Sequence, residues 1–269
     1  MGKFSGCLLA SDYDGTLADS HGRIPYEVRE AIKYFTGEGG LFTVCTGRTK
    51  QGFHAYDPEL INAPVLLANA AMGYDFKSEI TKYVTGVEKE DIPVVEYIRD
   101  NYPGLGIEIY SYDFRSCVIN PVRRNIEHFE WQSIDYEIVK DVPQDMFPAV
   151  KIMIHVGEER CMDFQNFLSG INLGGIKFIP QYGEFLELIS LKTDKGKGLL
   201  RLADIYGIDH GRVFAVGDGA NDVTMLSSAA VGFVPENGDA YAKSAGDVIV
   251  SSNDDFAVAD AIARIEKII

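Results

Sequence analysis

The sequence has few cysteines and no long apolar run, and each shortage excludes a class of protein. Its four cysteines, Cys7, Cys45, Cys117 and Cys161, form no CxxC pair and have no histidine at metal-ligand spacing. Neither a disulfide framework nor a zinc site is therefore expected. No stretch approaches the length of a transmembrane helix, and the short apolar run near the N-terminus leads straight into acidic residues. We expect a soluble, cytoplasmic protein with no membrane partner.

Positive charge is also scarce. The chain of 269 residues has 25 Lys and Arg against 40 Asp and Glu, which gives a formal net charge of -15. Bulk electrostatics therefore oppose binding to nucleic acid, and any phosphate group must be bound by a local site. Hydrophobic residues make up 46% of the chain, enough to build one large domain or two modest ones. We expect a monomer or a weak homo-oligomer.

Apolar strands that end in polar residues occur near both ends of the chain. Strands are predicted at 5–11, 41–45 and 64–68, and the pattern returns with a helix from Lys195 to Tyr206 and strands at 212–216, 231–234 and 248–250. Strands that alternate with helices in this way indicate a parallel sheet with right-handed crossovers. We therefore predict an α/β fold, a Rossmann-like, doubly wound parallel sheet, built from residues 1–82 and 189–269.

Residues 83–188 follow a different pattern. Apolar and polar residues alternate at 107–112 and 150–156, a short apolar run lies at 117–119, and helical patterns lie between these segments. Alternation predicts antiparallel strands with one solvated face. We expect an inserted α+β domain that interrupts the core.

Polar motifs follow the strands of the predicted core: DYDGT from Asp12, CTGR from Cys45, KGKG from Lys195 and GDGAND from Gly217. The carboxyl ends of parallel strands meet at one edge of a sheet, so these motifs should gather there. Their acidic side chains suit a hard cation such as Mg²⁺, which relieves the repulsion between them. The acids in question are Asp12, Asp14, Asp218 and Asp222.

In this order, the motifs DYDGTL, CTGR, KGKGL and GDGANDVTML resemble those of the haloacid dehalogenase superfamily of phosphotransferases. The insertion between the second and third motifs resembles the cap domain of its Cof-like, type IIB branch. The resemblance covers essentially the whole chain. It implies a magnesium-dependent phosphatase of small phosphorylated metabolites, sugar phosphates in particular, in which the cap provides substrate specificity.

The resemblance also implies roles for individual residues. Asp12 would be the nucleophile that forms an aspartyl-phosphate, and Asp14 would be the acid/base; in extended backbone, side chains at i and i+2 can face the same phosphoryl group. Thr46, with the backbone near Gly47, would bind a phosphoryl oxygen, and Lys195 would neutralise charge. The implied metal site comprises Asp12, the backbone carbonyl of Asp14, Asp218, and Asn221 and Asp222 as ligands or supporting residues.

Two departures from the family pattern are visible, and one of them, Cys45 before Thr46, changes little. The Cof-like branch usually has Asn-Gly-Ala after its third strand, whereas this chain has Asn69-Ala70-Ala71. Alanine restricts the backbone more than glycine does, so the role of Asn69 stays open.

Other interpretations of these residues remain. Asp12 and Asp14 could form a capped turn, Thr46 could cap a helix, and Lys195 belongs to a run of lysines. Basic residues of the insertion could contact substrate or form a solvated face: Arg115, Arg123, Arg124, His128 and His155. At the level of function, the alternatives are a phosphomutase of the same superfamily and a non-catalytic regulatory module that binds magnesium or phosphate.

Overall fold

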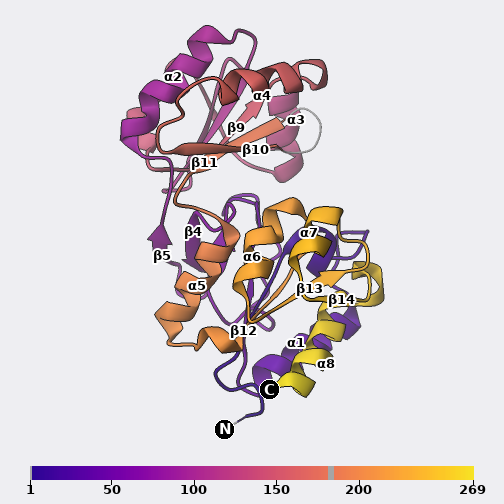
Figure 1. The fold of residues 1–269 in the computed structure, drawn as a ribbon. Helices are drawn as coiled ribbons and strands as arrows, with labels where there is room; N and C mark the ends of the chain where they lie inside the picture. The colour runs from indigo at the N-terminus through magenta and orange to yellow at the C-terminus, as the bar shows by residue number, and fades with distance from the viewer. Residues whose placement is uncertain (1, 181–184) are drawn as a thin grey trace. The chain divides into compact units, whose positions relative to one another are not determined.

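The computed structural model describes residues 2–180 and 185–269, and these residues group into two compact units (Figure 1). We call them the core unit, which contains the chain up to Gly47, Ala55–Lys82 and Asp194–Ile269, and the inserted unit, which contains Arg48–His54 and Tyr83–Thr193. None of the helices in the described residues combines the length and the apolar character needed to cross a membrane.

A parallel sheet in the order β14-β13-β12-β1-β2 forms the middle of the core unit. Its strands are β1 (Leu8–Ser11), β2 (Leu41–Val44), β12 (Val213–Val216), β13 (Val231–Pro235) and β14 (Val248–Val250). The chain proceeds from β1 to β2 in one direction and from β12 to β14 in the other, so the strand order reverses between β1 and β12. Ligands bind at such a switch point in open α/β sheets.

Helices cover both faces of this sheet. They are α1 (Tyr26–Gly37), α5 (Lys195–Tyr206), α6 (Val223–Ser228), α7 (Ala240–Ala245) and α8 (Ala257–Ile268). The crossovers through α1 and α6 run in opposite directions from the switch point, so right-handed connections place these helices on opposite faces. Figure 1 shows α1 beside α8 and, apart from them, α5 beside α6.

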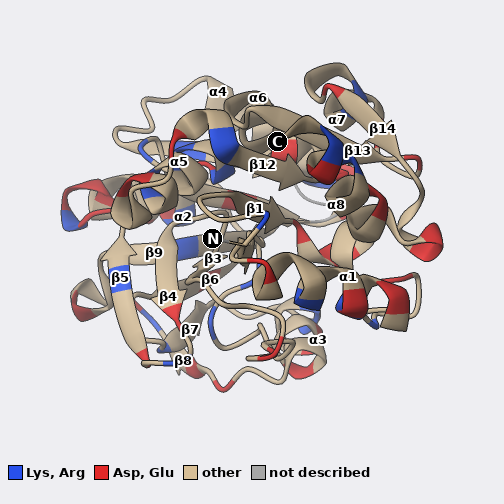
Figure 2. Ribbon diagram, turned by 90° about the horizontal axis from the view of Figure 1, so that it is seen from below, with Lys and Arg blue, Asp and Glu red and all other residues tan. Residues whose placement is uncertain are grey.

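The central strands are apolar because both of their faces are covered. Leu8, Leu9 and Ala10 of β1 are fully buried, as is Ala215 of β12. Figure 2 shows acidic and basic residues on helices, loops and outer strands such as β5 (Ile80–Val84), whereas β1 and β12 carry neither. This pattern is typical of parallel strands buried on both sides, and the prediction of a doubly wound α/β core is confirmed.

A smaller sheet in the order β3-β4-β5 lies beyond β2. It consists of β3 (Val65–Leu67), β4 (Met72–Asp75) and β5 (Ile80–Val84), and a parallel bridge from Cys45 to Leu66 connects it to the end of β2. The strand predicted at 64–68 is therefore present. The hairpin partner β4 was not predicted, because Met72-Gly73-Tyr74-Asp75 has neither an apolar run nor alternation.

The inserted unit contains a mostly antiparallel sheet in the order β10-β11-β9-β6-β7-β8. Its strands are β6 (Gly106–Ser111), β7 (Ser116–Ile119), β8 (Glu137–Val139), β9 (Ala149–His155), β10 (Ile176–Pro180) and β11 (Phe185–Ser190). Its helices are α2 (Ile92–Asn101), α3 (Arg123–Gln132) and α4 (Cys161–Ser169). The prediction of an inserted α+β domain is confirmed.

The prediction of one solvated sheet face is wrong for β6 and β9, because every residue of both strands is buried. Polar residues on the face opposite α2 and α4 are paired instead of hydrated. Glu108 accepts hydrogen bonds from Tyr110 Oη (2.7 Å) and Asn125 Nδ2 (2.9 Å), and Lys151 Nζ lies 3.3 Å from Glu187 Oε2. Alternation in the sequence shows which residues share a face of the sheet. It does not show that the polar face is exposed, because buried polar side chains can pair with one another.

The structure divides the chain differently from the sequence-based boundaries at two places. Residues 48–54, which the sequence analysis placed in the core, group with the inserted unit, because Gln51 Nε2 donates to Phe114 O (2.5 Å) and Arg48 lies 5.8 Å from the ring centroid of Trp131. The second boundary lies after Thr193 instead of after residue 188, because β11 runs to Ser190 and pairs with β9 and β10.

Candidate active site

Several of the predicted site residues lie at the carboxyl edge of the core sheet, beside the switch point. Asp12 follows β1 directly, Thr46 lies two residues past the end of β2, and Asp218 lies two residues past the end of β12. Lys195 is the first residue of α5, and the preceding Asp194 caps this helix by accepting a hydrogen bond from Lys197 N (2.8 Å). A carboxylate N-cap defines where a helix begins, so it determines where Lys195 enters the site.

The ammonium group of Lys195 links the carboxylates of Asp12 and Asp222. Its Nζ donates to Asp12 Oδ1 (2.7 Å) and to Asp222 Oδ1 (2.6 Å), and its side chain is completely buried. Burial alone would lower the pKa of Lys195, but the two carboxylates raise it above its ordinary value. Lys195 is therefore charged, whereas Lys197 pairs with Asp194 at the surface.

Asp12, Asp218 and Asp222 form an acidic cluster in which one carboxylate oxygen of each residue lies within 4.8 Å of the others. Burial and the charge of Asp222 raise the pKa of Asp12 well above its ordinary value, while Lys195 acts in the opposite direction. Burial also raises the pKa of Asp218, although a hydrogen bond from Thr16 opposes this shift. Oxygen donors with an excess of negative charge suit a hard divalent cation.

The turn after β1 packs directly on Asp218. Thr16 Oγ1 donates to Asp218 Oδ1 (2.6 Å), and Gly15 has a φ of 78°. A Cβ atom on Gly15 would lie 2.6 Å from Asp218 Oδ2, so glycine is needed both for the left-handed backbone and for this close approach. Thr16 was not assigned a role from the sequence, although it belongs to the DYDGT motif.

Asp222 organises the loop after β12. Its Oδ2 accepts from the backbone N–H groups of Asp218 (3.1 Å) and Gly219 (2.9 Å), and its Oδ1 accepts from Lys195. Both oxygens of this fully buried carboxylate are thus engaged by the protein. The contacts favour a supporting role for Asp222 over direct metal ligation.

Asp14 differs from the clustered acids. It is exposed, and its carboxylate is not part of the cluster formed by Asp12, Asp218 and Asp222. The backbone is extended at both Asp12 (φ −61°, ψ 160°) and Asp14 (φ −76°, ψ 122°). Tyr13, between them, is not among the residues of this turn that depart from helical geometry, so the backbone is not extended throughout. The role of Asp14 therefore stays a prediction.

The loops after β2 and β3 are joined to each other and to the loop after β12. Asn69 N donates to Thr46 O (2.9 Å), and Asn221 Nδ2 donates to Asn69 Oδ1 (3.3 Å). The carboxamide of Asn69 also lies next to Gly47, where an added Cβ would be 3.5 Å from Asn69 Oδ1. The structure therefore brings Thr46, Gly47, Asn69 and Asn221 together.

Comparison with known proteins gives the family. The sequence model of haloacid dehalogenase-like hydrolases matches residues 9–262. The chain belongs to this family. It is 24% identical to a 5-amino-6-(5-phospho-D-ribitylamino)uracil phosphatase of Bacillus subtilis, over 93% of this chain and 95% of that protein.

Solved structures of this hydrolase family have the same fold. A haloacid dehalogenase-like hydrolase from Bacteroides thetaiotaomicron superposes with a TM-score of 0.83 and 26% identity, over 96% of this chain and 99% of that one. A sugar phosphatase of HAD subclass IIB superposes with a TM-score of 0.80 and 19% identity, over 96% and 98%. The expected superfamily and its type IIB fold are confirmed, and the prediction of a phosphatase agrees with these relatives.

The loop after β3 has three successive residues in left-handed backbone. Ala68, Asn69 and Ala70 have φ values of 50°, 53° and 67° in succession, and all three residues are buried. Left-handed backbone is unfavourable for residues with a Cβ atom, and asparagine tolerates it better than alanine. Strain of this kind persists where the surrounding structure over-determines it, and here it orients Asn69 toward Gly47 and Asn221.

The basic residues of the inserted unit have partners within that unit. Arg115 pairs with Asp113 and Asp145, and Arg123 and Arg124 both pair with Glu127. His128 Nδ1 lies 2.8 Å from Glu108 Oε2, and the ring of His155 packs edge-on against Phe185. These residues are therefore parts of local networks, and contact with substrate stays a prediction for each of them.

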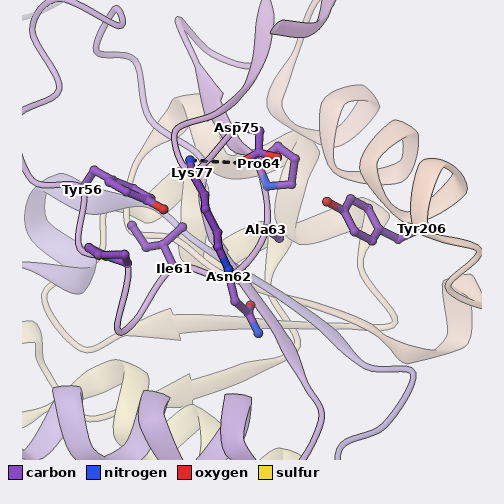
Figure 3. A pocket seen from close by; sticks show the side chains of 9 residues that line it. Tyr56, Ile61, Asn62, Ala63, Pro64, Asp75, Lys77 and Tyr206 are labelled. Carbon is purple, nitrogen blue, oxygen red and sulfur yellow. Dashed lines mark hydrogen bonds between the residues drawn. The ribbon is translucent and has the colours of Figure 1, made fainter. Parts of the chain in front are cut away.

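A separate cavity of about 120 Å³ lies at the start of β3, whereas Asn69 follows the end of that strand. Figure 3 shows side chains that line the cavity. Pro64, which precedes β3, lines it together with Tyr56, Asp75, Lys77 and Tyr206, among others. Asp75 accepts a hydrogen bond from Lys77 N (3.1 Å) and pairs with Lys82. This cavity contains none of the residues that the sequence motifs identify.

The strain at Ala70 leads to a first prediction. Ala70→Gly should increase the free energy of unfolding by about 1 kcal/mol, because relief of the left-handed penalty exceeds the added entropy of the unfolded chain. Ala229→Gly is the matched control, since Ala229 has an ordinary φ of −74°, and it should destabilise the protein. Urea denaturation monitored by circular dichroism measures both changes. A loss of stability in Ala70→Gly would contradict the assignment of strain.

Proposed function

We propose that the protein is a magnesium-dependent phosphatase of small phosphorylated metabolites, sugar phosphates in particular, which acts through an aspartyl-phosphate on Asp12. The observation that carries the proposal is the position of Asp12, which lies 2.7 Å from the buried ammonium of Lys195 and belongs to the acidic cluster with Asp218. A carboxylate beside a fixed positive charge can accept a phosphoryl group whose negative charge would otherwise repel it.

In the first step, a carboxylate oxygen of Asp12 forms a bond to phosphorus as the bond from phosphorus to the ester oxygen breaks. The carboxylic acid of Asp14 gives its proton to that ester oxygen, so the alcohol leaves neutral. Thr46 and the backbone near Gly47 bind a phosphoryl oxygen, and Lys195 neutralises charge on the transferred group. Catalysis of this kind depends mainly on positioning and on charge stabilisation.

In the second step, water attacks phosphorus while the carboxylate of Asp14 accepts a proton from it. The bond between phosphorus and Asp12 breaks, which releases inorganic phosphate and restores both carboxyl groups to their starting states. Asp222 keeps Lys195 in place through both steps, since its carboxylate is 2.6 Å from Lys195 Nζ. A phosphomutase would differ only in the acceptor, a sugar hydroxyl in place of water.

The acidic cluster fits the expected cofactor, Mg²⁺. Asp12, Asp218 and the backbone carbonyl of Asp14 would hold the ion, while Asn221 and Asp222 support the site. When bound, the ion supplies positive charge that offsets the repulsion among the carboxylates and the substrate phosphate. Burial, with a smaller contribution from the charge of Asp222, raises the pKa values of Asp12 and Asp218, and a bound cation would offset this cost.

The substrate class is supported by the relatives. One acts, by its name, on a phosphorylated ribitylamino compound, and another, of similar fold, is a sugar phosphatase. Both names describe phosphate esters of small polyhydroxylated molecules. We propose that the core unit is catalytic, that the inserted unit is the cap that selects the substrate, and that the enzyme acts in the cytoplasm as a monomer or weak homo-oligomer.

Activity on a panel of phosphomonoesters tests this function. With Mg²⁺ the protein should release inorganic phosphate, EDTA should abolish release, and Asp12→Asn should reduce kcat by at least about a thousandfold. Asp204→Asn is the control, because Asp204 is an exposed aspartate of α5 that pairs with His210. Equal turnover with Mg²⁺ and EDTA, or full activity in Asp12→Asn, would refute the mechanism. Transfer of phosphate to a sugar would identify a mutase.

A second prediction concerns stability without metal. Asp218→Asn should raise the melting temperature of the EDTA-treated protein at neutral pH and abolish the increase that Mg²⁺ produces. An acid whose pKa is raised in the folded state opposes folding once the pH exceeds its unfolded pKa, and asparagine removes this charge while keeping an acceptor for Thr16. A gain of about 1 kcal/mol would appear as about 2–4 °C.

Differential scanning fluorimetry with EDTA and with MgCl₂ measures both effects, and Asp204→Asn again serves as the control. A lower melting temperature in EDTA would contradict the electrostatic cost of the Asp218 charge, and an unchanged response to Mg²⁺ would show that Asp218 is not part of a metal site.

A further inference from the structure

Asn237 and Asn253 form a chain of hydrogen bonds that ends on the turn after Asp12. Asn237 lies two residues past the end of β13, and its Nδ2 donates to Gly15 O (2.8 Å). Asn253 follows β14; its backbone N–H donates to Asn237 Oδ1 (2.9 Å), and its Nδ2 donates to Ala18 O (2.9 Å). Gly15 and Ala18 are the first and last residues of the segment 15–18, which follows Asp14. The two asparagine side chains therefore hold this segment at both ends.

The conformation of the turn explains why an external partner is needed. The turn Tyr13–Leu17 is closed by a hydrogen bond from Ala18 N to Tyr13 O (2.9 Å). Within it, Asp14 (φ −76°, ψ 122°) and Gly15 (φ 78°, ψ −1°) depart from helical geometry. A backbone carbonyl that does not take part in a regular ladder needs another donor, and Asn237 provides it for Gly15.

The same short segment also holds Asp218. Asp239 N donates to Asp218 O (2.8 Å), two residues after the side chain that binds Gly15 O. Thr16 Oγ1 donates to the carboxylate of Asp218, and Gly15 packs against it. The segment from Asn237 to Asp239 therefore sets the position of the turn that carries Asp14 relative to the loop that carries Asp218.

We propose that Asn237 and Asn253 are positioning residues that aim the carboxyl group of Asp14 at the ester oxygen of the substrate. The proposal rests on the proposed function, in which Asp14 donates the proton to the leaving alcohol. Asn237 holds the peptide group between Gly15 and Thr16, because its partner is the carbonyl of Gly15. This peptide group lies one beyond the peptide group that follows Asp14. The backbone of the turn sets the direction in which the Asp14 side chain leaves the chain, so a turn that is held in place helps to aim its carboxyl group.

The dependence of the reaction rate on the leaving group of the substrate distinguishes this positioning role from a purely structural role. An alkoxide is a strong base and must be protonated as it leaves, whereas p-nitrophenolate is a weak base that can leave without a proton. A misplaced general acid therefore slows phosphorylation of the enzyme by alkyl phosphates far more than by p-nitrophenyl phosphate. Damage to the fold, to the nucleophile or to the metal site would slow both substrates alike.

The experiment compares kcat/KM for p-nitrophenyl phosphate with that for the alkyl phosphate which the unmodified enzyme hydrolyses best, at saturating Mg²⁺. We expect Asn237→Ala to lose about tenfold or more on the alkyl phosphate and less than about threefold on the aryl phosphate. Asn237→Asp keeps the acceptor for Asn253 N but lacks the donor to Gly15 O, so it should show the same selective loss.

Asn101→Ala is the matched control. Asn101 is also exposed and donates its Nδ2 to a backbone carbonyl, that of Tyr97 (2.9 Å), on helix α2 of the inserted unit. It should leave both rates unchanged. Asn253 is more buried than Asn237, so the proposal is tested on Asn237 if Asn253→Ala does not fold.

Equal losses on the two substrates, or no loss on either in both Asn237 variants, would overturn the positioning role. Failure of the proposed function gives a different result, because the unmodified enzyme would then hydrolyse neither phosphate.

Discussion

The burial of the Lys195 ammonium between Asp12 and Asp222 is the interaction on which the site depends. Its three members come from the end of β1, the start of α5 and the loop before α6, and Lys195 and Asp222 are fully buried. A buried charge without its partner costs several kcal/mol of folding free energy. The three elements must therefore be in place together, because the loss of one would leave a buried charge unpaired. Because the chain enters α5 directly from the inserted unit, this ion pair also ties the returning chain to the start of the core.

Around these three residues, several features cost folding free energy and serve the proposed reaction. Three carboxylates gather around the ammonium of Lys195, Gly15 approaches Asp218 too closely for a side chain, and Ala68–Ala70 adopts a strained left-handed backbone. Each feature orients or charges a group at the same sheet edge. Strain and excess charge of this kind are typical of functional sites and are supported by the well-packed sheet beneath them.

Much of this arrangement was predictable, because it follows from local patterns in the sequence. The apolar strands of the core and the motifs that follow them identify the parallel sheet and place Asp12, Thr46, Asp218 and Lys195 at one edge. The buried polar face of the inserted sheet was not predictable, since Glu108 alternates with apolar neighbours as a solvated residue would. Thr16 was missed although it belongs to the DYDGT motif. Asn237 and Asn253 were missed because a single carboxamide has no periodic signal and gains its role only from tertiary contacts.

The central claim is that Asp12 carries the phosphoryl group between the two steps. Rapid chemical quench of Asp14→Asn with p-nitrophenyl phosphate, followed by peptide mass spectrometry, tests it most directly, because this substrate needs no acid in the first step while the second step lacks its base. The account predicts a phosphorylated aspartate at position 12 that forms in a burst with p-nitrophenol and decays slowly. Release of phosphate without any phosphopeptide, or phosphate on another residue, would contradict it.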